Sequence, residues 1–238
     1  MIMLGTIVNT AAVVIGGGAG MLVKKGLKKD FQDSLMKTLG IAVIFLGTAG
    51  AMTGLLEFKD GAFPPRGTML MILSLTLGII TGELLKIENR MESLGERLKK
   101  LVRAESDNLF VQGFVTNALV ICVGAMAVVG ALQDGINRDP STLFAKAILD
   151  AMISMVFAAS LGVGVLFAAV PLFLYQGAIT LLAGVAAPFF TDEVVGNLSY
   201  IGNVLIAVVG VNLLFGKTVK VGNMLPALVF AVILGYWL

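Results

Sequence analysis

Eight apolar stretches, separated by short polar segments, dominate the chain. They cover residues 1–23, 34–56, 67–85, 109–132, 147–168, 170–189, 198–215 and 223–238. Each contains about 16–24 residues, and about 20 residues of α-helix cross the hydrocarbon core of a bilayer. The pattern predicts an all-α integral membrane protein with about eight transmembrane helices.

The longest apolar run, residues 147–189, is too long for a single crossing. Pro171 lies near its middle. Proline lacks a backbone N–H and clashes with the preceding turn, so it ends or kinks a helix. The run therefore predicts two helices joined by a tight turn at Pro171.

Composition supports a membrane location and excludes several kinds of site. Hydrophobic residues make up 58% of the chain and charged residues 13%, whereas soluble domains have about 45–50% and 25%. The net charge of +2 is too balanced to indicate a nucleic-acid partner. The chain has no histidine and a single cysteine, Cys122, which excludes histidine-based catalysis and intrachain disulfides. We expect no cofactor and no resident metal.

Basic residues predict the orientation of the helices. If the N-terminus is outside, the inner segments hold 13 of the 17 lysine and arginine residues, and the outer segments hold Lys59, Arg66, Arg138 and Lys146. The positive-inside rule then favours a multi-pass protein of the cell membrane with both termini outside.

One polar segment, residues 86–108, carries apolar residues at helical spacing. They are Ile87, Met91, Leu94, Leu98, Leu101 and Val102, with charged residues between them. The segment predicts an amphipathic helix on the inner side, lying on the membrane surface or against a partner, or serving only as a solvated connector.

Two parts of the chain resemble each other. Gly5-Thr6-Ile7-Val8-Asn9 precedes Gly16, Gly113-Phe114-Val115-Thr116-Asn117 precedes Gly124 at the same spacing, and Ser199, Asn203 and Gly210 keep this register. A second echo pairs residues 78–81 with 177–180. Because the first triplet of helices starts outside and the second starts inside, the echo predicts a 3+3 inverted-topology repeat, common in secondary transporters. Shared small residues that favour tight helix packing are the alternative explanation.

We therefore expect a single polytopic membrane domain with four parts. Residues 1–85 form the first three-helix repeat and 86–108 the cytoplasmic amphipathic loop. Residues 109–189 form the second repeat and 198–238 the two C-terminal helices.

Few residues in the apolar stretches can carry chemistry. Asp150 falls in the first turn of the fifth stretch, with Lys146 four residues earlier on the same helix face. The pair is either an interfacial ion pair or a proton- or cation-binding carboxylate near the outer mouth. Ionisable groups are costly in a bilayer, at about 2.5–3.5 kcal/mol on insertion scales.

Buried amides offer a second set of candidates. Asn9, Asn117 and Asn203 occupy matching positions of the echo, and Gln176 lies in the sixth stretch. They either bond one helix to another or converge on a site near the middle of the membrane.

The chain resembles the YdfK/YqgA-like membrane proteins of bacteria and archaea, the family of domain of unknown function 554, over nearly its whole length. The stretches that carry the resemblance are GTIVN at 5–9, GIAVIFLG at 40–47, GFVT at 113–116, VGAM at 123–126, GALQDG at 130–135, KAILD at 146–150, GVNLL at 210–214 and KVGNMLP at 220–226. The resemblance implies a polytopic membrane location and carries no activity. It places Asn9, Asp134, Lys146, Asp150 and Asn212 within family motifs, and with them Asn223.

These observations favour a secondary transporter or channel for an ion or small solute, with no enzymatic activity. Its site would lie near the midplane at the repeat interface, lined by the residues named above, and the protein would form a homo-oligomer in the lipid bilayer. The alternative is a non-transporting scaffold or regulatory subunit acting through residues 86–103. A lipid-processing enzyme is a weaker third possibility, because histidine and a second intramembrane carboxylate are missing.

Overall fold

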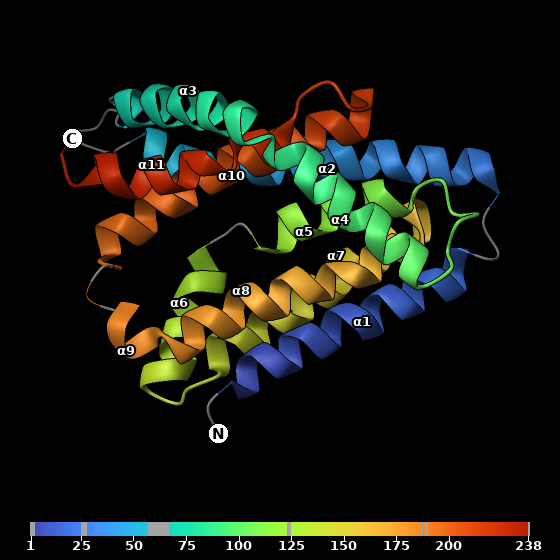
Figure 1. Cartoon of the computed structure of the whole chain (residues 1–238), viewed down its shortest axis with the longest axis horizontal. Coiled ribbons are helices and arrows are strands. Elements are labelled where there is room, and N and C mark those ends of the chain that lie inside the picture. The colour runs from blue at the N-terminus through green and yellow to red at the C-terminus, as the bar shows by residue number, and fades with distance from the viewer. Residues whose placement is uncertain are drawn as a thin grey trace. The chain divides into compact units, whose positions relative to one another are not determined.

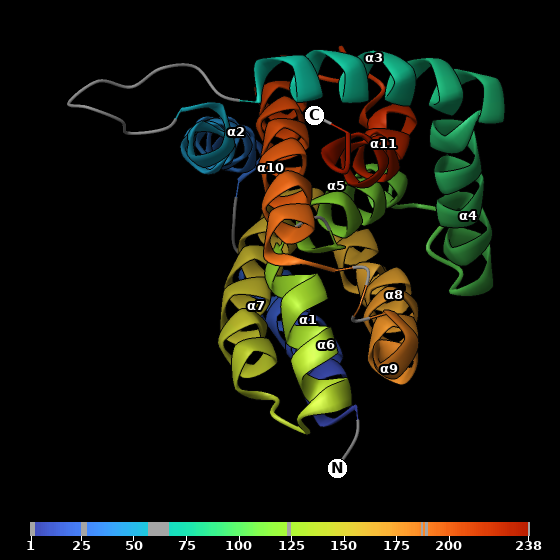
Figure 2. The same cartoon turned by 90° about the vertical axis from the view of Figure 1, so that its left-hand side faces the viewer.

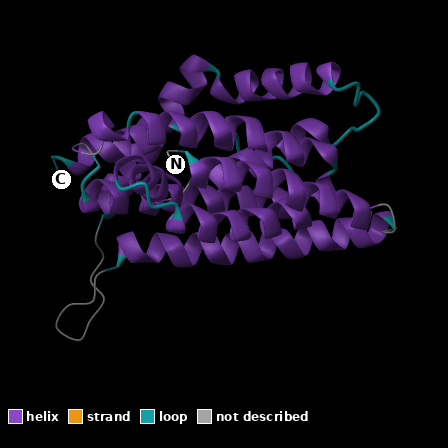
Figure 3. Cartoon of the chain, turned by 90° about the horizontal axis from the view of Figure 1, so that it is seen from below, coloured by secondary structure: helices purple, strands orange, loops and turns teal. Residues whose placement is uncertain are grey.

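A computed structural model describes residues 3–24, 28–56, 67–122, 125–186, 188 and 190–237. Within these residues the regular elements are helices, and no strand is present (Figure 3). The predicted all-α class is therefore confirmed. Lys25, Lys59, Arg66 and Gly124, which entered the predictions of orientation and repeat, lie outside the described residues.

The helices form two compact units that do not follow chain order. The first unit comprises Met1–Lys37, Met91–Cys122 and Met126–Pro188. The second comprises Thr38–Arg90, Val123–Ala125 and Phe189–Leu238. Each unit is described separately below.

The first unit is built on three long helices and a bent pair. Its helices are α1 (Leu4–Lys24), α5 (Phe110–Cys122), α6 (Ala125–Ile136), α7 (Ser141–Leu161), the 3₁₀ helix η1 (Val163–Ala168), α8 (Ala169–Leu181) and the short α9 (Ala183–Ala186). α1 and α7 lie side by side, and α8 lies next to α1 (Figures 1 and 2).

Missing side chains on α1 allow α7 to approach closely. A Cβ on Gly16 would lie 2.2 Å from the carbonyl oxygen of Ala151, and one on Gly20 would lie 2.0 Å from that of Met155. This is backbone-to-backbone packing of the small-xxx-small type, which is common between membrane helices. It fixes the register of α1 on α7, and therefore the height at which their polar side chains meet.

The second unit pairs α2 with α10 and α3 with α11. Its elements are α2 (Lys29–Leu55, whose first residues belong to the first unit), α3 (Thr68–Leu85), α10 (Asp192–Phe215), η3 (Val221–Met224) and α11 (Pro226–Gly235). Its core includes Leu70, Tyr200 and Ile201 with two alanines of α11. Gly78 and Gly82 of α3 lie against Ala227 and Asn223, so α3 and α11 are antiparallel.

Six helices in the described residues are long and apolar enough to cross a membrane. They are Leu4–Lys24, Asp33–Leu55, Thr68–Leu85, Ser141–Leu161, Val163–Leu181 and Asp192–Phe215. α5 and α6 form a pair bent by 62°, and Val221–Gly235 is a shorter apolar helix. The predicted total of eight crossings stays a prediction.

The predicted break at Pro171 is wrong, although the long apolar run does contain two helices. α7 ends at Leu161, and Gly162 follows with φ of +90°, a conformation that glycine adopts without steric cost. Pro171 is the third residue of α8, in its first turn. An N–H there has no partner within the helix, so proline is tolerated. Gly162, rather than Pro171, ends the helix.

The predicted amphipathic helix is present as α4 (Ile87–Leu101). It follows α3 after Lys86, which has φ of +53°. Its first residues, up to Arg90, belong to the second unit and the remainder to the first.

Candidate functional site

Lys146 and Asp150 form a buried ion pair in the middle of α7. Their side chains are only 7% and 5% exposed. α7 begins at Ser141, so Asp150 lies about 14 Å along a helix of about 32 Å. The expectation that Asp150 occupies the first turn of its helix is therefore wrong. The apolar stretch that defined that start excluded Lys146, which the helix includes because the ammonium group is paired.

The ammonium of Lys146 also binds the end of α5. Lys146 Nζ donates to the backbone carbonyl of Ile121 over 2.8 Å and to Asp150 Oδ2. α5 ends at Cys122, and the last four carbonyls of a helix have no partner within it. A cation is favoured at this negative end of the helix dipole. Lys146 therefore links the carboxylate to the end of α5, the first helix of the bent α5–α6 pair.

The Asp150 carboxylate is held from a second side by α1. Asn9 Nδ2 donates to Asp150 Oδ2 over 3.0 Å and to Gln176 Oε1 over 3.2 Å. Asn9 and Gln176 are fully buried. Side chains from α1, α7 and α8 thus meet at one level with the carbonyl from α5, and four of the predicted site residues are among them.

Asn117 extends this polar face by one helical turn. Its Nδ2 donates to Ser154 Oγ over 3.0 Å and to the Val165 carbonyl over 3.1 Å. Ser154 follows Asp150 by four residues on α7, so Asn9 and Asn117 bond to successive turns of the same helix face. Val165 belongs to η1, so Asn117 connects α5 to α7 and to η1.

Asp134 lies at the beginning of α1. Its Oδ2 accepts the backbone N–H of Gly5 over 3.0 Å, and the residue is fully buried. A carboxylate is favoured there by the free N–H groups and the helix dipole. Between this contact and the Asn9 level, the hydroxyl oxygens of Thr6 and Thr180 lie 3.3 Å apart. A polar track therefore runs along α1 from Gly5 to Asn9.

Three buried polar atoms of the track have no hydrogen-bond partner within the described residues. They are Asn9 Oδ1, Asp134 Oδ1 and Gln176 Nε2. Such an atom costs about 1–3 kcal/mol when it stays unpaired. Two acceptors and one donor are thus available to bond a polar solute or water along the track.

Asn203 and Asn212 lie in the second unit and bond locally. Asn203 Nδ2 donates to the Ser199 carbonyl of its own helix over 2.8 Å. Asn212 Oδ1 accepts the backbone N–H groups of Thr218 and Val219, and its Nδ2 donates to the Val219 carbonyl. Asn212 therefore shapes the turn after α10, and convergence of all three echo asparagines stays a prediction.

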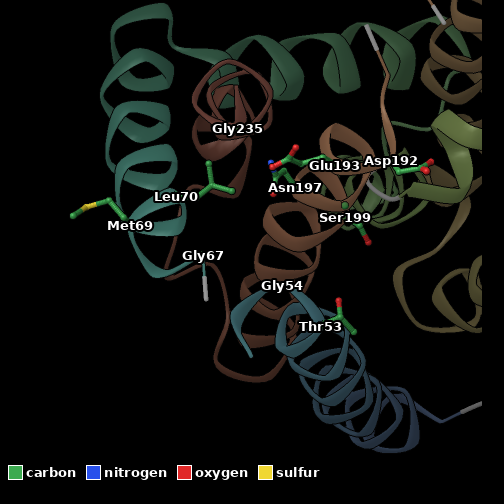
Figure 4. Close-up of a pocket in the computed structure, with 11 residues that line it drawn as sticks. Thr53, Gly54, Gly67, Met69, Leu70, Asp192, Glu193, Asn197, Ser199 and Gly235 are labelled. Carbon is green, nitrogen blue, oxygen red and sulfur yellow. The ribbon is translucent and has the colours of Figure 1, made fainter. Parts of the chain in front are cut away.

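The second unit contains an open pocket of about 690 Å³ where four helix ends meet (Figure 4). Its lining residues are Thr53, Gly54, Gly67, Met69, Leu70, Asp192, Glu193, Gly196, Asn197, Ser199 and Gly235. None of the eight predicted site residues is among them.

The structure adds three residues to the eight predicted for the first unit's site and the second unit: Thr6 and Ser154, which sequence reasoning did not select, and Thr180, which it noted only as a polar residue of an apolar stretch. A signal was available for each. Ser154 continues the four-residue spacing of Lys146 and Asp150, Thr180 follows Gln176 by four residues, and Thr6 precedes Asn9 by three. Positions three or four apart share a helix face.

Comparisons with known proteins agree with a membrane location. A family model described as "Protein of unknown function (DUF554)" matches residues 4–236. The chain belongs to this family. It is 32% identical over 226 residues to the "Uncharacterized membrane protein YdfK" of Bacillus subtilis (strain 168), covering 95% of this chain and 93% of that protein.

A second relative, the "Uncharacterized protein YqgA" of Escherichia coli (strain K12), is 29% identical over 232 residues, which cover 96% of this chain and 94% of that protein. No solved structure matches. The family membership and the apolar helices make this chain a membrane protein in contact with lipid.

Proposed function

We propose that this protein is a secondary transporter or channel for an ion or small solute, with its site in the buried polar core of the first unit. The observation that carries the proposal is the contact between Lys146, Asp150 and the carbonyl of Ile121 at the end of α5. The proposed role is non-catalytic.

The energetic argument starts from the cost of the ion pair. A charged side chain at the centre of a membrane helix costs about 2.5–3.5 kcal/mol on insertion scales. A buried ion pair seldom stabilises a fold more than apolar residues of similar volume. Stability alone therefore gives no reason for two charges in the middle of α7, whereas recognition of a charged or polar solute does.

The bend of 62° between α5 and α6 supports the same role. Backbone that leaves the helical pattern at membrane depth is tolerated where it is enclosed by protein or lines a watery cavity. Discontinuous helices whose ends meet polar groups form the substrate and ion sites of many secondary transporters. In the first unit, the end of α5 meets the ammonium group of Lys146 beside this bend.

The directions of the helices support eight crossings in an alternating order. In the first unit, Gly5 and Asn9 contact Leu143 and Asp150 in the same order, so α1 and α7 are parallel. Asn117 contacts Ser154 and Ile121 contacts Lys146, in reverse order, so α5 is antiparallel to α7. α1 and α5, whose first turns carry the echoed motif, therefore run in opposite directions. This agrees with an inverted repeat and with both termini on the same side of the membrane, which the positive-inside rule predicts to be the outer side.

Flux through reconstituted protein tests the proposal. Sealed liposomes containing the full chain would be given opposing gradients of Na⁺, K⁺, H⁺, NH₄⁺ and Cl⁻ in turn, and the movement of each ion would be followed. We expect flux of at least one ion above that of protein-free liposomes. Asp150→Asn should abolish it, and Asp139→Asn, an exposed carboxylate between α6 and α7, should not. Equal flux in wild type and Asp150→Asn would contradict the assigned site, and no flux across the panel would contradict ion permeation.

A further inference from the structure

Two leucines of α4, Leu94 and Leu101, are turned away from the face by which the helix packs. The two buried positions of α4 are Glu88 and Gly95. Glu88 accepts the backbone N–H of Gly222 over 2.6 Å, and a Cβ on Gly95 would lie 3.1 Å from the ring of Phe114. Leu94 and Leu101 are 45% and 79% exposed. The exposed leucine row is therefore not used for packing within the described chain.

A row of arginines lies directly beside these leucines. Arg90 precedes Leu94 by four residues, and Arg97 precedes Leu101 by four, so the two rows are about 40° apart around the helix. Both arginines are exposed, and neither guanidinium group forms a hydrogen bond or ion pair with any residue in the described ranges. Their long side chains can extend their charged ends beyond the leucines.

We propose that this face of α4, with Leu94 and Leu101 inserted at the acyl boundary, binds anionic phospholipid headgroups through Arg90 and Arg97. A helix that lies in the membrane interface has this arrangement of adjacent apolar and basic rows. The planar guanidinium group binds phosphate through two parallel hydrogen bonds.

The charge balance of the exposed face favours an anionic surface over a neutral one. Arg90, Arg97 and Lys100 are exposed along α4, against the single exposed carboxylate of Glu96 in the same helix. Each basic residue near an anionic leaflet strengthens binding by about 1 kcal/mol. Removing both arginines should therefore weaken the preference for anionic over neutral phospholipid by roughly 10- to 30-fold at most.

Lipid retention by the full-length protein tests the proposal. The protein would be equilibrated with vesicles of phosphatidylcholine and phosphatidylglycerol in equal amounts and re-purified in neutral detergent, and its retained lipids would be counted by mass spectrometry. We expect wild type to retain phosphatidylglycerol preferentially, and Arg90→Gln/Arg97→Gln to lose most of that preference. Arg90→Lys/Arg97→Lys, which keeps the charge without the fork, should retain part of it.

The matched control is Lys28→Gln/Lys37→Gln. It removes two exposed charges from the same predicted side of the membrane, but not from α4. We expect the lipid preference of this variant to equal that of wild type. Equal losses in the control and arginine variants would overturn the assignment to α4. An unchanged preference in Arg90→Gln/Arg97→Gln would also overturn it and would leave the face to a protein partner. Circular dichroism and size-exclusion chromatography establish that each variant remains folded.

Discussion

Breaking the Lys146–Asp150 pair from one side should be far more damaging than replacing both residues. Lys146→Met removes the ammonium, so Asp150 keeps only its bond from Asn9 and the Ile121 carbonyl loses its donor. Removing one partner of a buried ion pair costs about 3–5 kcal/mol, because the other charge stays buried and unpaired. Asp150→Leu should cost a similar amount, since it leaves the ammonium of Lys146 with the carbonyl alone.

The double variant Lys146→Met/Asp150→Leu leaves two apolar side chains of similar size in contact. It still lacks the bonds to Ile121 and Asn9, which are worth about 0.6 kcal/mol each by the average for membrane helices. The double variant should therefore be only about 1 kcal/mol less stable than wild type. The coupling energy between the two positions should be about 4 kcal/mol or more.

Equilibrium unfolding in mixed micelles with a rising fraction of SDS measures these free energies, with helix content followed by circular dichroism. Lys37→Met, which alters an exposed lysine, is the control and should change stability by less than about 0.5 kcal/mol. If the two single effects add within about 0.5 kcal/mol, the residues are uncoupled and the reasoning about the pair is refuted.

Three further predictions concern packing and charges elsewhere. Gly20→Ala should lower the unfolding free energy by about 1–3 kcal/mol, because the new Cβ would meet the Met155 carbonyl. Gly18→Ala, which has open space around it, should leave the stability equal or higher. Equal losses in the two variants, measured by SDS unfolding, would contradict the close packing of α1 on α7. Glu88→Gln should cost about 1–3 kcal/mol of stability in the same assay, because the buried carboxylate binds Lys217 Nζ at 2.9 Å and accepts the N–H of Gly222. Glu96→Gln, which alters an exposed carboxylate of the same helix, should cost less than about 0.5 kcal/mol. Equal effects of the two substitutions would contradict a stabilising role for the Glu88–Lys217 ion pair. The N–H and hydroxyl of Ser141 hold the pKa of Asp139 below its ordinary value of 3.8, so its stabilisation is present above pH 3.8 and is lost as pH falls below that value. The stability deficit of Asp139→Ala at pH 7 should therefore shrink in acid, and a deficit independent of pH would exclude this charge effect.

The lengths of the apolar stretches were sufficient to predict the helices, because backbone groups in lipid must bond within each segment. They were insufficient to place helix ends within long apolar runs. Gly162 ends α7 through its positive φ, and hydropathy does not distinguish this glycine from those within helices. Proline at 171 was a strong local signal, but its effect depends on its position in the helix.

The site was predicted in part. Lys146 and Asp150 were selected because charges are rare in apolar stretches, and Asn9 because it matched the echo. Their contacts with Gln176 and with the Ile121 carbonyl depend on which helices are neighbours. Glycines at 16 and 20 determine the approach of α1 to α7, and the sequence does not name the partner of a small residue. Chain order also does not indicate that α1 packs with α5 to α8 in one unit.

Reaction of the natural cysteine with a water-soluble thiol reagent tests most directly whether a solute can reach the proposed site. Cys122 is the only cysteine in the sequence. It ends α5 and directly follows Ile121, whose carbonyl accepts the hydrogen bond from Lys146 Nζ. A small, charged, membrane-impermeant methanethiosulfonate would be applied to sealed liposomes from either side, with SDS-unfolded protein as the measure of complete labelling and Cys122→Ser as the blank. The account predicts labelling of the folded protein from at least one side, because a transport site must open to water. Labelling only after unfolding would contradict it, since the end of α5 would then be closed to solutes.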